Sequence, residues 1–377
     1  MSKSNWTWWI VLALIASAIL VLLGVLTGRQ SLKPLVSLAP GESETIRASV
    51  LEVLEETTVG QGEFAQPYQH LRLRLSGGPL AGQEIEVEHG LLGFTNESRT
   101  FQAGDRVLVD HAVTLEGEDV FLVTDFVRTG PLLWLTLLFA VATVALSGRQ
   151  GLRSLVGMGF SLLVIGGFIV PRILAGWNPM LVAIAGSVVM MGGSLYLVYG
   201  WNKKTHVAVG GLFVTLVLTG MLAVWSVQLT RLSGFGAEEA SFLQAAGFQI
   251  DTKGLLLAGI IVGTLGALDD IAVGQSSTIF ELNKANPTLE RRTLFAHGMT
   301  VGRDHIAAMV NTLFLAYVGA SLPLLLLFTV FAEPIGITLN REIVAEEVVR
   351  TLVGSLGLLA GVPLTTALAV LVARRRS

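Results

Sequence analysis

Long apolar runs separated by short polar segments occupy most of the chain. A bilayer core about 30 Å thick requires roughly 20 apolar residues in a helix, and these runs reach that length. Residues 37–128 differ, because apolar and polar positions alternate there over short stretches, as they do in half-buried β-strands. The pattern predicts an α-helical polytopic membrane protein with an inserted β-domain. Eight transmembrane helices are expected, at residues 8–26, 131–147, 152–170, 180–199, 207–229, 254–273, 304–330 and 351–372.

The same patterns divide the chain into three domains. These are an N-terminal transmembrane anchor (1–30), an extracytoplasmic β-domain (37–128) and a seven-helix transmembrane domain (131–373). Turns that contain glycine separate five short segments of the β-domain, which predicts a small β-barrel similar to an OB-fold. We expect a structural or partner-docking role for this domain, with ligand binding as the alternative. The predicted strands are residues 45–55, 70–75, 84–89, 106–115 and 120–127.

Three shorter helices are expected between the spans. Pro287 favours a helix start and Gly298 favours a stop, so a short cytoplasmic helix is predicted over residues 287–297. A second short helix is predicted over residues 237–246. Residues 340–350 place aliphatic side chains on one helix face and charged side chains on the other, which predicts a helix lying on the outer surface of the membrane.

The composition agrees with a membrane location and excludes several kinds of chemistry. Hydrophobic residues make up 52% of the chain, and the net charge of −3 gives no reason to expect a nucleic-acid partner. The sequence has no cysteine, which excludes disulfides, thiolate nucleophiles and cysteine-ligated metals. It also lacks phosphate-loop, dinucleotide-binding and zinc-protease motifs. Since His297, Asp304 and His305 match no compact metal site, we expect no metal and no cofactor.

Basic residues are distributed unevenly among the polar segments. With a cytoplasmic N-terminus, the inside segments contain Lys203, Lys204, Lys284 and the arginines at 374–376, and the outside loops between the later spans contain fewer basic residues. Basic residues are enriched on the cytoplasmic side of membrane proteins. The distribution therefore predicts that both termini are cytoplasmic and that the β-domain is extracytoplasmic.

Two adjacent acids interrupt an otherwise apolar span. Asp269 and Asp270 are the only ionisable residues between Gly254 and Phe280. Placing an Asp at the centre of a membrane helix costs about 2.5 to 3.5 kcal/mol, so such a residue normally faces protein or a water-filled path. At helical spacing, Asp270 shares a stripe with small residues that would let a neighbouring helix approach closely. We expect Asp270 to face this neighbour, and Asp269 to have a weaker claim. The predicted helix-packing residues are Gly259, Gly263, Gly266 and Gly274.

A second polar cluster lies near the start of the span at residues 304–330. Asp304 and Asn311 share one face at helical spacing, and Arg303 lies beside them. If this helix packs antiparallel to the helix of Asp270, Arg303 provides a countercharge for either acid. Asp270, Asp304, Arg303 and Asn311 are therefore the candidate residues of a substrate or ion pathway. The alternative is that the charges near residue 304 mark a cytoplasmic helix end and extend to water.

The same region carries a family resemblance. Its motifs are Gly263-Thr264-Leu265-Gly266-Ala267, Asp270-Ile271-Ala272-Val273, Asn286-Pro287, Gly298, Gly302-Arg303-Asp304, Asn311-Thr312 and Ala316-Tyr317-Val318-Gly319. This pattern resembles the YibE/F family of bacterial multi-pass membrane proteins. The resemblance implies a polytopic fold and a bacterial plasma-membrane location, without a settled activity. Asp269 and His305 depart from the pattern, so the resemblance assigns them no role.

Three functions remain open. The first is a transporter or permease-like protein for a small solute or ion, in which Asp270 and Asp304 bind protons or cations. The second is a non-catalytic membrane scaffold that displays the β-domain to an envelope partner. The expected partners are the lipid bilayer, a small solute or ion, and either an envelope protein or further copies of the chain in a homo-oligomer. The third is an intramembrane aspartyl-type hydrolase in which Asp270 and Asp304 share a proton. The Gly-x-Gly-Asp signature expected of such an enzyme is absent, so we expect no enzymatic activity.

Overall fold

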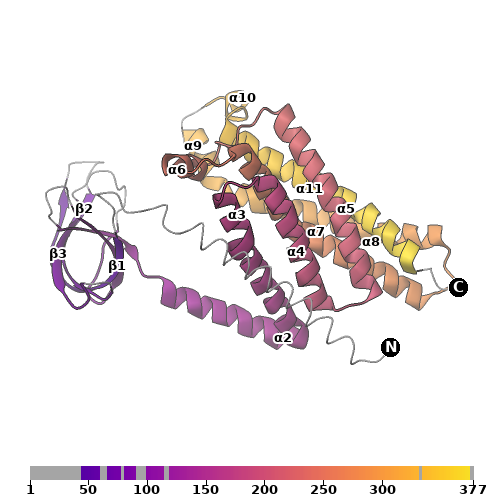
Figure 1. The fold of residues 1–377 in the computed structure, drawn as a ribbon, viewed down its shortest axis with the longest axis horizontal. Helices are drawn as coiled ribbons and strands as arrows, with labels where there is room; N and C mark the ends of the chain where they lie inside the picture. Colours follow the sequence, from indigo (N-terminus) through magenta and orange to yellow (C-terminus); the bar gives the residue numbers. More distant parts are fainter. Residues whose placement is uncertain are drawn as a thin grey trace. The chain divides into compact units, whose positions relative to one another are not determined.

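The computed structural model describes residues 44–59, 66–77, 80–90, 99–113, 119–330 and 333–373. The predicted first span, residues 8–26, and the arginines at 374–376 lie outside the described residues. The chain divides into two compact units between Ala142 and Thr143. One unit contains a β-sheet, and the other contains a bundle of helices (Figure 1).

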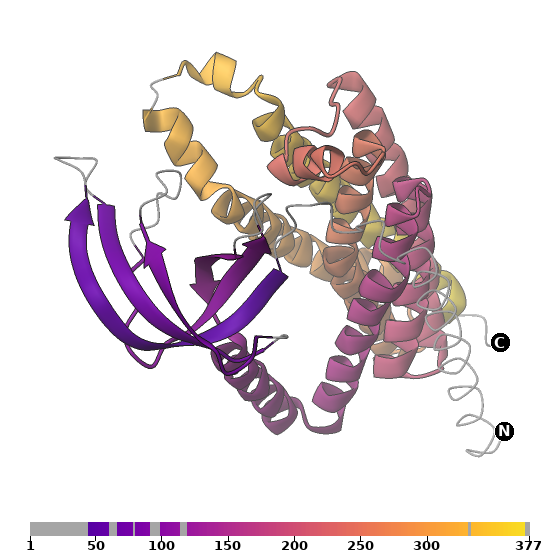
Figure 2. The same cartoon turned by 60° about the vertical axis from the view of Figure 1, so that its left-hand side comes forward.

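The β-unit is a curled, antiparallel sheet of five strands (Figure 2). Its order is β3-β2-β1-β4-β5, and β3 also contacts β5. Alternate side chains of β1, β2 and β4, such as Val50, Leu73 and Val107, are almost fully buried and pack around Phe101. The prediction of five strands is therefore confirmed. The strands are β1 (Glu44–Val59), β2 (Gln66–Leu75), β3 (Glu84–His89), β4 (Arg106–Val113) and β5 (Asp119–Phe126).

The rest of the described chain is helical. Five helical segments are long and apolar enough to cross a membrane, or six if the bent pair α8 and α9 counts as one span. The two predicted spans 131–147 and 152–170 fall in one such segment, Thr129–Leu174, which breaks sharply at Gly148, where φ is 57°. The count of eight spans is therefore not confirmed. The helices are α2 (Thr129–Val164), the π-helical segment η2 (Ile165–Ile169), α3 (Val170–Leu174), α4 (Pro179–Tyr199), α5 (Lys203–Leu229), α6 (Glu238–Ala245), α7 (Thr252–Ala285), α8 (Arg291–Ala320), α9 (Leu322–Val330), α10 (Ile335–Thr338) and α11 (Glu342–Ala373).

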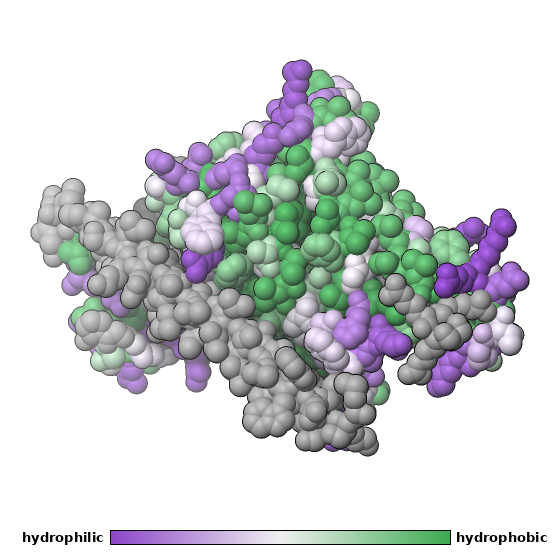
Figure 3. All heavy atoms as spheres, turned by 45° about the vertical axis from the view of Figure 1, so that its right-hand side comes forward, coloured by the Kyte–Doolittle hydropathy of each residue, from purple (hydrophilic) through white to green (hydrophobic). Residues whose placement is uncertain are grey.

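Large apolar side chains cover the outward faces of the helical unit. Leu181, Met221, Trp225 and Leu352 each expose more than half of their surface. Figure 3 shows these apolar faces as a continuous region with hydrophilic side chains toward its margins. A water-soluble monomer rarely exposes an apolar area of this extent, whereas lipid contact requires one.

Two of the three short-helix predictions are wrong, and one is confirmed. The helix predicted to end before Gly298 instead continues, because α8 runs unbroken from Arg291 to Ala320. Gly298 is buried against Ile279 and Thr366, so its small size serves packing. Residues 342–350 are the first turns of the long helix α11 and do not form a separate surface helix. Helix α6 confirms the prediction over residues 237–246.

Glycines facing threonines hold α5, α7 and α11 close together. A Cβ on Gly211 of α5 would lie only 2.5 Å from Thr365 Oγ1 of α11, and one on Gly354 of α11 would lie 2.8 Å from Thr264 Cγ2 of α7. Gly357 of α11 packs in the same way against Thr219 of α5. Within lipid there is little hydrophobic force between helices, so close backbone approach at small residues supplies much of the association energy. These three helices form the centre of the unit (Figure 1).

The first prediction tests this packing. Replacing Gly357 by Leu forces a branched side chain against Thr219, and overpacking of this kind typically costs about 1 to 3 kcal/mol. The control is Gly319→Leu on α8, where a Cβ meets no other described atom within 4 Å. We expect a lower thermal unfolding temperature in detergent for Gly357→Leu only. Equal effects of the two substitutions would contradict the packing argument.

The second prediction concerns the β-unit, which has its own core and turns. A fragment of residues 37–128 should fold alone and give a β-rich circular-dichroism spectrum. Arg128 donates a hydrogen bond to Asp125 and holds the pKa of that carboxyl below its ordinary value of 3.8. A lowered folded-state pKa stabilises the fold above about pH 4, and this contribution is lost as the pH falls through the lowered value. Asp125→Asn should remove that part of the acid sensitivity. A random-coil spectrum at neutral pH would refute the prediction.

Candidate functional site

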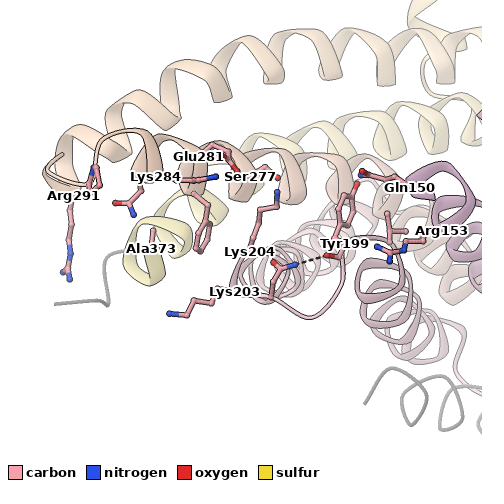
Figure 4. A pocket seen from close by; sticks show the side chains of 15 residues that line it. Gln150, Arg153, Tyr199, Lys203, Lys204, Ser277, Glu281, Lys284, Arg291 and Ala373 are labelled. Atoms are coloured by element: carbon pink, nitrogen blue, oxygen red, sulfur yellow. Dashed lines mark hydrogen bonds between the residues drawn. The ribbon is translucent and has the colours of Figure 1, made fainter. Parts of the chain in front are cut away.

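A groove of about 1530 Å³ opens at one end of the helical unit. We call it the basic groove, because among the described residues that line it five are basic and one, Glu281, is acidic. Figure 4 shows these side chains extending from α2, from the start of α5, from the C-terminal end of α7 and from the start of α8. The basic residues are Arg153, Lys203, Lys204, Lys284 and Arg291.

The turn between α4 and α5 places two of these lysines. Gly200 ends α4 with φ at 80°, a conformation that suits glycine. Asn202 caps α5 by accepting a hydrogen bond from the Thr205 backbone N–H at 3.0 Å. Its side-chain amide also donates to the Tyr199 carbonyl at 2.8 Å, which Figure 4 marks with a dashed line. These local bonds start α5 directly at Lys203, at the edge of the basic groove.

The acid pair lies about two helical turns before Ser277, the first residue of α7 that lines the groove. The pair is near Tyr199, which also lines the groove. Asp269 is the more buried of the two acids, and its Oδ1 atom is buried with no hydrogen-bond partner among the described residues. Asp270 is exposed. Both carboxyl groups are within electrostatic range of Tyr199, and Asp270 is within electrostatic range of His305 on α8.

The glycine stripe predicts that Asp270 faces a closely packed neighbouring helix, whereas in the structure Asp270 is exposed. The inward face of α7 is its most apolar stripe, which includes Ile260, Leu268 and Ile271. The predicted glycine stripe lies beside that face. Gly263 and Gly274 do approach α8, since a Cβ on them would lie 3.4 Å from the Tyr317 hydroxyl and 3.2 Å from the His305 ring. Gly259 and Gly266 are exposed, with no described atom within 4 Å of an added Cβ.

The face of α8 that packs on α7 is not the predicted face of Asp304 and Asn311. Arg303, Asp304 and Asn311 are all exposed, and the structure does not bring them to Asp270. Instead, the stripe that includes Ile306 and Met309 packs on the main core. His305 follows Asp304 by one residue, a rotation of about 100° around a helix with 3.6 residues per turn. That rotation directs His305 toward α7 and leaves Asp304 outside.

Buried polar side chains join four helices beneath the basic groove. The Thr366 hydroxyl of α11 donates to Gln275 Oε1 of α7 at 3.0 Å, and both residues are almost fully buried. Gly302 of α8 packs directly against the Gln275 amide. Ser276 donates to the Lys204 carbonyl of α5 at 2.8 Å. The sequence analysis missed these residues, although uncharged polar residues inside an apolar span are a usable signal. Within the described ranges, no three His, Asp or Glu side chains gather as metal ligands would.

The apolar helices and their lipid-compatible surface define a polytopic membrane protein with transmembrane helices. Residues 135–375 match the family model described as YibE/F-like protein, and this match covers well over half of the chain. The chain therefore belongs to the YibE/F family, as its sequence motifs suggested. No curated protein and no solved structure matches the chain.

The third prediction tests the buried bond between α7 and α11. In a double-mutant cycle of Gln275→Leu and Thr366→Val, the two losses of stability should couple, because Thr366→Val alone leaves the buried Gln275 amide without this partner. The Thr366 hydroxyl left by Gln275→Leu can still donate to the Val362 carbonyl at 2.7 Å. Hydrogen bonds between membrane helices average about 0.6 kcal/mol by this method. The free energy of unfolding in detergent is measured for the wild-type chain, for each single variant and for the double variant. Strictly additive losses would show that the two side chains act independently.

Proposed function

We propose that this protein is a transporter or permease-like protein that moves a small solute or ion, with Asp269 and Asp270 as its proton or cation site. The observation that carries this proposal is the buried Oδ1 atom of Asp269, which has no partner among the described residues. A carboxyl group in an apolar span is costly and is typical of proton relays and ion pathways. The helical spacing of small residues favours Asp270. The unpartnered atom shifts the central role to Asp269.

The surroundings favour a proton over a metal cation. An isolated carboxylate in a low-dielectric setting is relieved when it takes up a proton. His305, within electrostatic range of Asp270, and Tyr199, within electrostatic range of both acids, are groups that can accept or donate protons. The basic groove that Tyr199 also lines repels cations and attracts anions. A proton-coupled solute is therefore the form of transport that these charges support best.

The hydrolase alternative needs two carboxyl groups that share a proton. The predicted pair is Asp270 with Asp304. Because Asp304 is exposed on α8, the structure gives this pairing no support. The scaffold alternative draws support from the β-unit. The strand order β3-β2-β1-β4-β5 and the contact between β3 and β5 fit an OB-like barrel, which we propose as a docking module for an envelope partner.

For the membrane topology, we propose a plasma-membrane protein with both termini cytoplasmic and the β-unit extracytoplasmic. Arg153, Lys203, Lys204, Lys284 and Arg291 come from distant parts of the sequence, yet all line one groove at one end of the helices. Enrichment of basic residues on one side of a membrane is typical of the cytoplasmic side.

The fourth prediction tests the acid pair. Asp269→Asn keeps the shape of the side chain but cannot exchange a proton, so proton-coupled flux in liposomes should fall to that of empty liposomes. Asp270→Asn should also reduce flux. Asp304→Asn is the matched control, because it makes the same chemical change on an exposed face of α8 and should leave flux unchanged.

A pH-sensitive dye inside the liposomes measures the flux, at equal amounts of reconstituted protein. Full activity of Asp269→Asn would refute a proton site at this acid. Loss of flux in Asp304→Asn as well would show that the exposed carboxyl of α8 is also needed for transport, and would contradict a site confined to Asp269 and Asp270.

A further inference from the structure

We propose that the basic groove binds the phosphate headgroup of an anionic phospholipid, with one acyl chain lying in an apolar pocket below Lys203. This inference is independent of transport, because it uses neither Asp269 nor Asp270. Five basic side chains and one acid line the groove. Among the ion pairs of the described residues, none includes Arg153, Lys203, Lys204, Lys284 or Arg291. Their charges are therefore open to an external anion.

The groove lies at the level expected for lipid headgroups. Helix α7 has 34 residues, so at 1.5 Å per residue it is about 51 Å long, against a hydrocarbon core of about 30 Å. Its apolar part occupies the first two-thirds, so its polar end, with Ser277 and Lys284, extends into the interface. Trp201 supports this level independently. It stacks on Tyr196 at 4.5 Å and is half exposed, as is typical of aromatic residues at a membrane interface.

An apolar pocket adjoins the groove on its membrane side. This pocket has a volume of about 360 Å³ and lies between α5 and α11, where Val207, Leu368 and Val372 line it. Lys203 lines both the pocket and the basic groove. Gly210 forms part of the pocket wall, and an added Cβ there meets no described atom within 4 Å. One molecule with an anionic head and an apolar tail matches both sites, whereas a soluble phosphate uses only the groove.

Basic pockets between membrane helices suit phosphate headgroups, because lysine provides a compact charge and arginine a planar set of donors. Ser277 and Asn202 add uncharged hydrogen-bonding groups to the same groove. The chemistry of the site therefore selects against a neutral zwitterionic lipid, whose own ammonium group would meet the lysines.

The test measures lipid binding to the full-length protein in a non-ionic detergent by titration calorimetry. The probes are short-chain phosphatidylglycerol, short-chain phosphatidylcholine and inorganic phosphate. Wild-type protein should bind phosphatidylglycerol more tightly than either of the others. In Lys203→Gln/Lys284→Gln, the affinity for phosphatidylglycerol should fall about fivefold per basic residue, or about 25-fold in total. The matched control is Arg231→Gln/Lys253→Gln, which removes equal charge at the other ends of α5 and α7 and should bind as wild type does.

A third variant separates the tail from the head. Gly210→Phe fills the apolar pocket and retains every charge, so it should weaken phosphatidylglycerol binding and leave phosphate binding unchanged. Unfolding temperatures confirm that each variant is folded. Equal affinity for the two lipids, or unchanged binding in Lys203→Gln/Lys284→Gln, would overturn the proposal. Phosphate binding as tight as that of phosphatidylglycerol would overturn the lipid assignment in favour of a soluble anion.

Discussion

Close contact between glycines and threonines is the interaction on which the helical unit depends. Helices α5, α7 and α11 approach one another where Gly211 faces Thr365 and where Gly354 faces Thr264. At such contacts a methyl group or hydroxyl of one helix fills the space that a missing side chain leaves on the other. Because lipid tails are as apolar as the helices themselves, dense packing of this kind stabilises the bundle where burial from water cannot. The positions of the acids and of the basic groove follow from this arrangement.

The packing also explains how polar groups are accommodated inside the bundle. Gln275 and Thr366 satisfy each other across the α7 and α11 interface, and Ser276 bonds a carbonyl at the start of α5. Several threonines that face glycines donate to carbonyls of their own helices, as Thr215 and Thr219 do at 2.8 Å. Thr365, which faces Gly211, has no such partner among the described residues. The Asp269 Oδ1 atom finds no partner within the described residues, and neither do the buried hydroxyls of Ser187 and Thr205. Asp269 is the only carboxylic acid among the described side chains with such an atom, and this sets its site apart.

Two sites with opposite charge thus lie toward the same end of the helical unit. The acid pair is held on the side of α7, and the basic groove opens around the end of that helix, with Tyr199 related to both. Helix α7 can carry both sites because it is longer than the thickness of the bilayer core. Its middle remains in an apolar setting while its end reaches the interface. Acidic and basic side chains therefore lie within a few helical turns of one another on α7.

Much of the fold followed from the sequence. Apolar runs predicted the helices α4, α5, α7 and α11, and period-two alternation predicted the five strands, because both patterns depend on local geometry. Single-residue signals were less reliable. Pro287 and Gly298 suggested a separate short helix, yet α8 continues through Gly298 because that glycine packs against Ile279.

The sequence by itself determined that Asp269 and Asp270 interrupt an apolar span and that basic residues cluster in certain polar segments. Only the tertiary structure decided which acid is the more buried, and that His305 rather than Asp304 faces α7. The physical reason is that a long helix carries several stripes of similar apolarity, and packing against its neighbours selects one of them. Likewise, only folding brings Arg153, Lys203 and Arg291 around one groove, because they lie far apart in sequence and share no periodicity.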